Sequence, residues 1–229
     1  PPPVELELFL MSKCPFGVQA LERIFPVAEQ LGDRLKLRLD YIVSEKPEGG
    51  GFSALHGEPE VVGNKQQLCA MALAHTPGAW RRFITCQNRK WREIPSGWEP
   101  CADEAEIKRD ALKACVEGVQ GDALLRASMA RSVAKKAHGS PTILVAGQRY
   151  QGPRTVKAFM RAVCGHSSAP PPAVCQALPP VVEVHAVVLS DKRCGKACDA
   201  DRAVKALRGR FFPNLKVTTL DYGDPEGKR

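Results

Sequence analysis

A single cysteine between a strand and a helix is the feature that most constrains how this chain can fold. Residues 4–10 form a strand-like run, and apolar side chains then recur at helical spacing from Val18 to Leu31. Cys14 and Pro15 stand between the two, and Pro15 suits a first helical turn, where its missing N–H costs little. Cys14 therefore lies just before a helix N-terminus, where the helix dipole and free backbone N–H groups favour a thiolate.

The residue three positions after Cys14 departs from the usual redox motif. A dithiol C-x-x-C site needs a second cysteine there, and this chain has Gly17. In a dithiol site one thiolate attacks a disulfide, and the second thiol then releases the mixed disulfide. With Cys14 alone, release must come from glutathione, a substrate thiol or another protein cysteine. The pattern leaves monothiol exchange, isomerisation or a loss of chemistry open.

The cysteine content bears on the compartment in which the protein works. The chain has nine cysteines among 229 residues, and most lie in regions predicted as helices and linkers. They are either buried free thiols of a cytosolic protein or structural disulfides of an oxidising compartment such as a bacterial periplasm. We favour the second interpretation and expect a periplasmic or secreted protein. An odd number leaves one thiol unpaired, and Cys14 is the natural candidate, which we expect to be at least partly accessible.

Composition excludes several classes of function. The net charge is +8, but the basic residues are dispersed in pairs, so nucleic-acid binding is not expected. No apolar run approaches the roughly 20 residues that span a bilayer, so we expect no integral membrane segment, and no signal peptide is expected at the proline-rich start. A zinc site made by Cys194, Cys198 and a histidine would match no usual structural spacing, so no metal or cofactor is expected.

The first half of the chain alternates between the periods of strand and helix. Residues 35–43 predict a second strand, so strand, helix and strand form a right-handed βαβ unit. The pattern then becomes helical from about residue 60 to 136. Helices are expected at 63–74, 79–88 and 121–137. Another is expected between Asp103, as the N-cap of a capping box with Glu106, and Gly118.

Strand character returns after this helical stretch. Residues 142–145 predict a strand, Ala146–Arg149 a two-residue hairpin turn with Gly147 at its first central position, and residues 152–163 a helix. The order is thus β-α-β, helices, β-β-α. This is the order of an α/β thioredoxin-like fold, over residues 1–165, with an all-helical insertion at about 53–138.

Pro141 stands just before the third strand of this order. Thioredoxin-like folds place a cis-proline there, facing the reactive cysteine. A proline that opens a strand also has a plain edge-turn interpretation. We prefer a cis Ser140–Pro141 bond because of its place in the order of elements.

The C-terminal part resembles the start of the chain. Residues 166–180 are rich in proline and serine and predict a semi-rigid linker. Residues 181–229 then predict a partial second thioredoxin-like βαβ unit, with strands at 181–189 and 216–220 and a helix at 199–208.

Cys194 follows the first strand of this second unit, and Cys198 stands four residues further on. On a helix their Cα atoms would be about 6 Å apart, within the range of a disulfide. We expect this C-x-x-x-C pair to be oxidised. It is either an exposed redox centre or a small staple at the start of the helix.

The first 165 residues resemble the DsbA-like thiol oxidoreductases of the thioredoxin superfamily and, within them, the gamma-interferon-inducible lysosomal thiol reductase group and its bacterial relatives. The residues that stand at the spacing of the family signature are His56-Gly57, Glu60, Asn64 and Cys69. Ala54 and Val61 replace two signature cysteines, which are missing together as expected of a pair. The cysteines at 86, 101 and 115 and the segment 139–142 also follow the family pattern.

The remaining cysteines suggest three bridges. Cys86–Cys101 and Cys164–Cys175 each bracket a short connection next to a helix, and Cys69–Cys115 follows by elimination. Each would contribute a few kcal/mol according to the loop-closure model.

Two functions from different classes remain open. The first is thiol–disulfide exchange, with protein thiols or disulfides as substrates, in which Cys14, Pro141, Cys194 and Cys198 form the site residues. The second is a thioredoxin-fold binding or assembly module that has lost the chemistry and takes a protein partner. His56 is either a base near Cys14 or a loop histidine that caps the first helix of the insertion.

Overall fold

The computed structural model of the protein describes residues 2–47, 50–198, 200–212 and 214–228. Its first elements form the expected βαβ unit of β1 (Val4–Leu10), α1 (Pro15–Leu31) and β2 (Leu35–Tyr41), with the short 3-10 helix η1 (Gly32–Arg34) before β2. β1 pairs in parallel with β2 along its whole length. Almost every residue of β1 is buried, as is typical of a strand that is covered on both faces.

The sheet is completed by the strands that follow the helical insertion. β1 pairs antiparallel with β5 (Thr142–Val145), and β5 pairs antiparallel with β6 (Gln148–Arg149), so the order is β2-β1-β5-β6. The mixed α/β, thioredoxin-like fold class predicted from the sequence is confirmed. The hairpin turn is shifted by one residue from its prediction: Val145 pairs with Gln148, so Ala146 and Gly147 are the central residues, and both have positive φ.

The main core lies between the sheet and α1. Leu6, Leu8 and Leu10 of β1 belong to the main core together with the apolar face of α1. α7 (Val156–Cys164) packs against α1. α7 begins later than the predicted residue 152, because Thr155 is its N-cap and accepts a hydrogen bond from the backbone N–H of Ala158.

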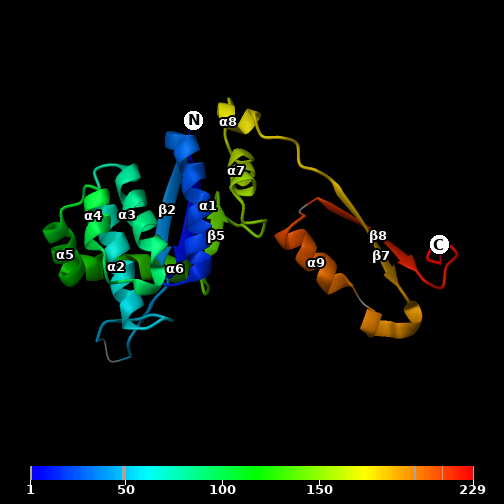
Figure 1. Ribbon diagram of the computed structural model, residues 1–229, viewed down its shortest axis with the longest axis horizontal. Coiled ribbons are helices and arrows are strands. Elements are labelled where there is room, and N and C mark those ends of the chain that lie inside the picture. Colours follow the sequence, from blue (N-terminus) through cyan, green and yellow to red (C-terminus); the bar gives the residue numbers. More distant parts are fainter. Residues whose placement is uncertain (1, 48–49, 199, 213, 229) are drawn as a thin grey trace.

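The insertion is a cluster of helices beside the sheet (Figure 1). Its helices are α2 (Glu58–Leu73), α3 (Pro77–Arg89), η2 (Trp91–Glu93), α4 (Glu99–Glu104), α5 (Arg109–Glu117) and α6 (Val119–Ala134), and a short antiparallel pair, β3 (Ser44–Glu45) and β4 (Phe52–Ser53), precedes them. Gly118 closes α5 as predicted, but Asp103 is not an N-cap. It lies inside α4, which starts earlier with a proline in its first turn, and Glu106 after that helix has a positive φ of 57°.

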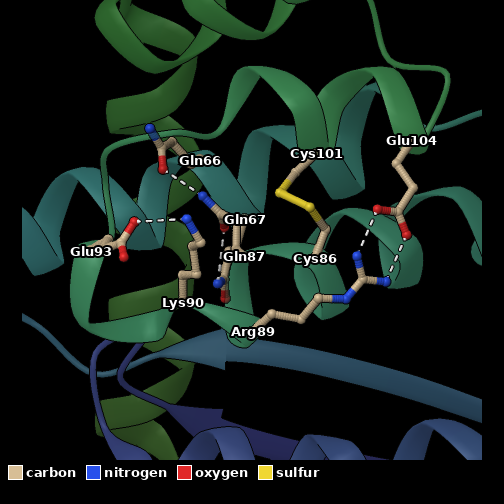
Figure 2. The surroundings of a disulfide bond; sticks show 9 residues. All are labelled: Gln66, Gln67, Cys86, Gln87, Arg89, Lys90, Glu93, Cys101 and Glu104. Atoms are coloured by element: carbon tan, nitrogen blue, oxygen red, sulfur yellow. Dashed lines mark hydrogen bonds and ion pairs between the residues drawn. A yellow bond between two sulfur atoms is a disulfide. The ribbon is translucent and has the colours of Figure 1, made fainter.

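Three disulfides hold the helices together, and they are the three pairs expected from the sequence. Cys69–Cys115 joins α2 to α5, Cys86–Cys101 joins α3 to α4, and Cys164–Cys175 joins α7 to the short α8 (Ala173–Gln176). Figure 2 shows that polar contacts flank Cys86–Cys101, with Arg89 donating to both carboxylate oxygens of Glu104 at 3.0 Å.

The segment predicted to form a second unit contains β7 (Val184–Ser190), the 3-10 segment η3 (Lys192–Cys198), α9 (Asp201–Arg210) and β8 (Leu215–Asp221). β7 and β8 pair in parallel from Val184 with Leu215 to Ser190 with Asp221. In Figure 1 these elements lie apart from the four-stranded sheet. The predicted start of the last helix, residue 199, lies outside the described residues.

Candidate thiol site

Cys14 sits at the junction of β1 and α1 that the sequence predicts. It is the N-cap residue of α1 and, of the cysteines whose side chains the structure describes, the free one. Its backbone N–H donates to Met11 O at 3.0 Å, and its carbonyl accepts the N–H of Val18 at 3.1 Å. The side chain is 7% exposed. The expectation that it would be at least partly accessible is therefore wrong, because the neighbouring loop covers it.

The covering loop is the segment before β5. The Ser140–Pro141 peptide bond is cis, and Cys14 Sγ donates to Ser140 O at 3.5 Å. Ser140 Oγ in turn accepts a hydrogen bond from the backbone N–H of Met11 at 3.0 Å. The loop is thus joined to the turn that carries Cys14 through both its main chain and its side chain.

Gly17 lies directly under this loop. A Cβ atom added at Gly17 would be 2.7 Å from Ser140 Oγ and 3.4 Å from Leu10 Cδ2. Ser140 therefore fills the space in which the side chain of a second cysteine would start. The site thus lacks both the second thiol and the free space beside Gly17 that its side chain would need.

α2 supports the other side of the turn. Asn64 Oδ1 accepts the backbone N–H of Ser12 at 3.0 Å, and Glu60 Oε1 accepts the backbone N–H of Lys13 at 3.1 Å. The ammonium group of Lys13 donates to Arg92 O at 2.7 Å and also to the carbonyl of Ile94. Each residue of the turn before Cys14 is therefore hydrogen-bonded either to the insertion or to the loop before β5.

His56 stands just before Gly57, the N-cap of α2. Its ring Nδ1 lies 2.7 Å from Glu60 Oε1, and its backbone N–H donates to Glu60 Oε2 at 3.1 Å. Within the described residues, no hydrogen bond or ion pair joins His56 to Cys14. Its contacts correspond to the interpretation of a loop histidine at the start of α2.

Several of these groups escaped sequence reasoning. Ser140 and Ser12 gave no signal by themselves, because small polar residues are common in turns. Glu60 and Asn64 did carry a signal: four residues apart on a helix, they share one face. Their place in the family signature pointed to them, but not to the backbone N–H groups that they bind.

Burial shifts the pKa of two tyrosines, one on β2 and one just after β6. Burial, and then the charge of Asp40, raises the pKa of Tyr41 on β2 well above its usual range. The Tyr41 hydroxyl donates to Gln67 Oε1 of α2. Burial also raises the pKa of Tyr150 to about 12. Both phenols therefore stay protonated to a higher pH than an ordinary tyrosine does.

Cys194 in the second unit is disulfide-bonded. The side chain of Cys198 lies outside the described residues, so the pairing of the two stays a prediction. Asp191 beside this turn accepts hydrogen bonds from the side chain and the backbone of Arg193, which lower its pKa to about 2. Within the part of the chain that the structure describes, no cluster of three or more His, Cys, Asp or Glu is arranged to hold a metal ion.

The sheet order, the cysteine at the start of α1 and the opposing cis-proline loop define a thioredoxin-like fold similar to that of DsbA-like proteins. Solved structures with this fold include a putative protein-disulfide isomerase from Pseudomonas syringae (TM-score 0.53, 15% identity, 70% of this chain and 93% of that one). They also include the oxidoreductase DsbA from Xylella fastidiosa (TM-score 0.52, 15% identity, 70% and 82%) and the thiol-disulfide oxidoreductase MdbA from Actinomyces oris (TM-score 0.55, 14% identity, 73% and 83%).

Within this group, residues 5–105 match the family model of gamma interferon inducible lysosomal thiol reductase (GILT). The chain is also 26% identical over 199 residues to a gamma-interferon-inducible lysosomal thiol reductase-like protein of Anopheles gambiae, over 77% of this chain and 81% of that one. The resemblance predicted from the sequence is confirmed by these two matches. In the described residues, no helix has the length and apolar character needed to cross a bilayer.

Proposed function

We propose that this protein carries out thiol–disulfide exchange with Cys14 as the single attacking thiol of its first unit, residues 1–165. The fold and the family are those of thiol reductases and disulfide oxidoreductases. The observation that supports a monothiol reaction is the geometry at Gly17, where Ser140 Oγ occupies the place of a second cysteine. Pro141 lies opposite Cys14 and would shape the approach of a substrate disulfide.

The reaction takes place in two exchanges. The Cys14 thiolate attacks one sulfur of a disulfide R–S–S–R, a Cys14–S–S–R bond forms, and R–S⁻ leaves. A thiolate from outside the site then attacks the R sulfur of this mixed disulfide, so Cys14 leaves again as a thiolate. Across the two exchanges, one sulfur of the original disulfide is released as the thiolate R–S⁻, and the other ends in a disulfide with the external thiol, which is thereby oxidised. Glutathione, a substrate thiol or another protein cysteine can fill this role.

Protein thiols or disulfides are the proposed substrates, and an oxidising compartment is the proposed location. The three disulfides support this location, because such bridges persist in secreted and periplasmic proteins. We also propose that residues 166–180 link the first unit to a separate second unit, residues 181–229. Cys194 and Cys198 would form a further redox centre there, and the disulfide state of Cys194 supports this assignment.

The second candidate function is a binding or assembly module that kept the fold and lost the chemistry. Two observations favour it: the chain has Gly17 in place of the second cysteine, and the Cys14 side chain is only 7% exposed. In that case a protein partner would bind the surface around the Cys14 turn without forming a covalent bond.

Reaction with glutathione disulfide separates the two functions. We expect the folded protein to gain one glutathione at Cys14, detected by peptide mass spectrometry, and to lose it again when reduced glutathione is added. A Cys14→Ser variant should gain none at this position. If Cys14 stays unmodified in the folded protein but reacts readily once the chain is unfolded in urea, the exchange function is wrong and the binding module is favoured.

A further inference from the structure

The backbone of the turn before Cys14 is held by two polar side chains of one helix. We infer that Glu60 and Asn64 of α2 are positioning residues for Cys14, because they bind the backbone N–H groups of Lys13 and Ser12, the two residues that precede the thiol. This inference rests on the proposed exchange function of Cys14. It assigns to α2 the task of keeping the thiol in line with the Ser140–Pro141 loop.

Glu60 is the stronger of the two supports. Its side chain is fully buried, and both of its carboxylate oxygens are occupied. Oε1 accepts from Lys13 N at 3.1 Å and lies 2.7 Å from His56 Nδ1, while Oε2 accepts from His56 N at 3.1 Å. A buried carboxylate needs such donors to offset its lost hydration. Glu60 therefore fixes the Lys13 backbone and the loop before α2 relative to each other.

Asn64 repeats this contact one helical turn further along. It is also fully buried, and its Oδ1 accepts from Ser12 N at 3.0 Å. Its Nδ2 has no hydrogen-bond partner within the described residues. The amide is thus kept in the interior with only its acceptor in use, and its unpaired Nδ2 donor costs free energy. Within the described residues, the one hydrogen bond of this side chain is the one that it accepts from Ser12 N.

The helix that carries both side chains is itself anchored. Cys69, further along α2, is bonded to Cys115 of α5. Ser12 Oγ adds a hydrogen bond to the carbonyl of Glu60 at 3.3 Å. The turn is therefore braced against a cross-linked helix on one side, while Met11 N–H binds Ser140 Oγ on the other. Cys14 is placed between two fixed surfaces and has little freedom to swing away from the loop.

Four variants test the inference. Glu60→Ala and Asn64→Leu remove the acceptors, and Glu60→Gln keeps an Oε1 acceptor for Lys13 while losing the charge. Gln67→Leu is the control, because Gln67 is a buried polar residue of the same helix, but its contacts go to Tyr41 and Gln87. Each is compared with the unaltered protein in amide hydrogen exchange, in reaction of Cys14 with a small aromatic disulfide, and in urea unfolding.

We expect Glu60→Ala to lower the protection of the Lys13 amide by about tenfold or more, since a hydrogen bond to a charged acceptor is lost. Asn64→Leu should act in the same way on the Ser12 amide. The amides of Leu6 and Leu8 in β1 should be less affected. Both variants should slow the disulfide reaction of Cys14 by roughly tenfold, and Glu60→Gln should restore part of the rate. Gln67→Leu should lower global stability without a selective effect on Ser12 or Lys13.

The inference is overturned if Glu60→Ala and Asn64→Leu resemble Gln67→Leu, with the same loss of protection throughout β1 and an unchanged Cys14 rate once stability is accounted for. If Glu60→Ala does not fold, Glu60→Gln and Asn64→Leu carry the test alone. A wild-type Cys14 that does not react with the disulfide at all would contradict the proposed function. The amide exchange of Ser12 and Lys13 would still decide on the positioning role.

Discussion

Ser140 and Gly17 share one small volume under the cis-proline loop, and their coupling can be measured. Gly17→Cys places a Cβ atom 2.7 Å from Ser140 Oγ, so either the hydroxyl or the start of α1 must move. We expect Gly17→Cys to lower the free energy of unfolding by roughly 1–3 kcal/mol, as overpacked substitutions do. Adding Ser140→Ala should recover part of this, with a coupling of about 1 kcal/mol in urea unfolding.

The control for this pair is Gly139→Ala, one residue before Ser140. An added Cβ at Gly139 meets nothing within 4 Å, so this variant should leave the stability within about 0.5 kcal/mol. The double variant with Gly17→Cys and Ser140→Ala should also form a disulfide between Cys14 and the introduced cysteine in a glutathione buffer. Additive effects of the two substitutions would show that Ser140 does not occupy the cysteine position.

The raised pKa of Tyr41 makes the stability of the folded protein decrease at alkaline pH. The Tyr41 pKa in the folded state is raised above the ordinary value of 10.0, so the folded state holds the proton while the unfolded chain releases it. This contribution to stability is complete below about pH 10 and is lost as the pH rises toward the folded-state pKa. By pH 11 the loss reaches about 1.4 kcal/mol.

Tyr41→Phe should remove this part of the pH dependence. We expect the variant to be less stable than the wild type at pH 7, because the hydrogen bond to Gln67 is lost, and the difference to shrink between pH 9 and 11. Urea unfolding across this pH range measures both effects. A constant difference between the two proteins would contradict the raised pKa.

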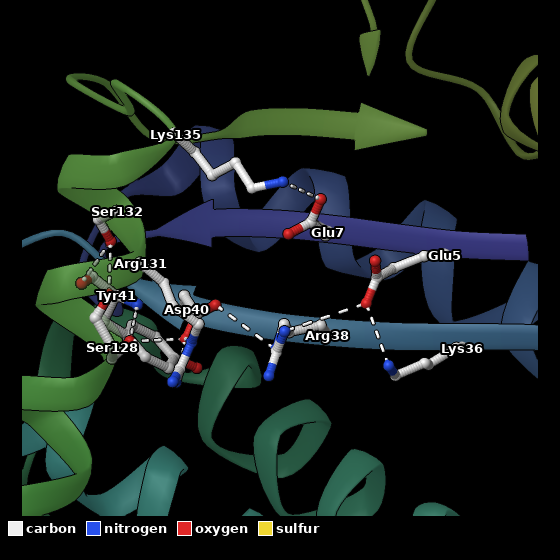
Figure 3. A network of polar contacts seen from close by, with 10 residues as sticks. All are labelled: Glu5, Glu7, Lys36, Arg38, Asp40, Tyr41, Ser128, Arg131, Ser132 and Lys135. Atoms are coloured by element: carbon white, nitrogen blue, oxygen red, sulfur yellow. Dashed lines mark hydrogen bonds and ion pairs between the residues drawn. The ribbon is translucent and has the colours of Figure 1, made fainter. Parts of the chain in front are cut away.

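At the scale of secondary structure, α6 is attached to the sheet through buried charge. Asp40 of β2 is fully buried and Glu7 of β1 nearly so; Asp40 is paired with Arg131 and Glu7 with Lys135, which lies just after α6 (Figure 3). Removing one partner of such a pair leaves an uncompensated charge in the interior. These two pairs therefore hold the last helix of the insertion against the sheet that carries Cys14.

Arg131→Met should cost more stability than Arg126→Met, although both residues lie on α6. Arg131 binds the buried Asp40, whereas Arg126 pairs with Glu45, which is about half exposed. We expect a loss of roughly 2–4 kcal/mol for Arg131→Met and under about 1 kcal/mol for Arg126→Met in urea unfolding. Equal losses would mean that solvent screens the Asp40 pair as fully as the exposed one.

The elements themselves were largely predictable, and their ends were not. β1, β2 and β5 stand out in the sequence because the spacing of their apolar residues fits a strand and does not fit a helix. The capping box at Asp103 failed because a proline in the first turn of α4 starts that helix earlier, which places Asp103 in its interior. The hairpin turn failed by one residue because Ala146 adopts a positive φ that a sequence pattern would assign to glycine.

For the molecule as a whole, the three disulfides should differ in their resistance to reduction. Cys69 and Cys115 are buried and close a long loop, while Cys164 and Cys175 are more accessible. The loop-closure model assigns about 4 kcal/mol to the first bridge and about 3 kcal/mol to the second. In a graded dithiothreitol titration we expect the bridge of Cys194 to open first, then Cys164–Cys175, and Cys69–Cys115 last.

Peptide mapping after alkylation of the released thiols measures this order. The bridge of Cys194 is expected to be the first because the turn that carries it is polar, and exposed bridges are the more labile ones. If it resists reduction longer than Cys86–Cys101, it is a structural staple and the second unit loses its proposed redox role.

The places of Cys14 at the start of α1 and of a cis-proline at Pro141 were predictable from the order of strands and helices, whereas their role as site residues stays a prediction. Two disulfides were predicted from the connections that their cysteines bracket, and Cys69–Cys115 by elimination. The burial of Cys14 was not predictable, because it depends on how the loop at Ser140 closes over the turn. The same holds for Glu60 and Asn64, whose partners are backbone groups that no sequence pattern marks.

If residues 181–229 form the separate unit proposed above, the Cys164–Cys175 bridge also limits how far that unit can move from the first. With the bridge closed, Arg34 donating to the carbonyl of Pro170 and Arg161 contacting that of Pro179, the segment is folded back on α7. The chain leading to β7 then starts after Cys175, and residues 176–183 reach at most roughly 28 Å. With the bridge open, residues 165–183 can reach roughly 65 Å. Oxidation of Cys164 and Cys175 therefore shortens the flexible connection between the two units and raises the local concentration of each unit around the other.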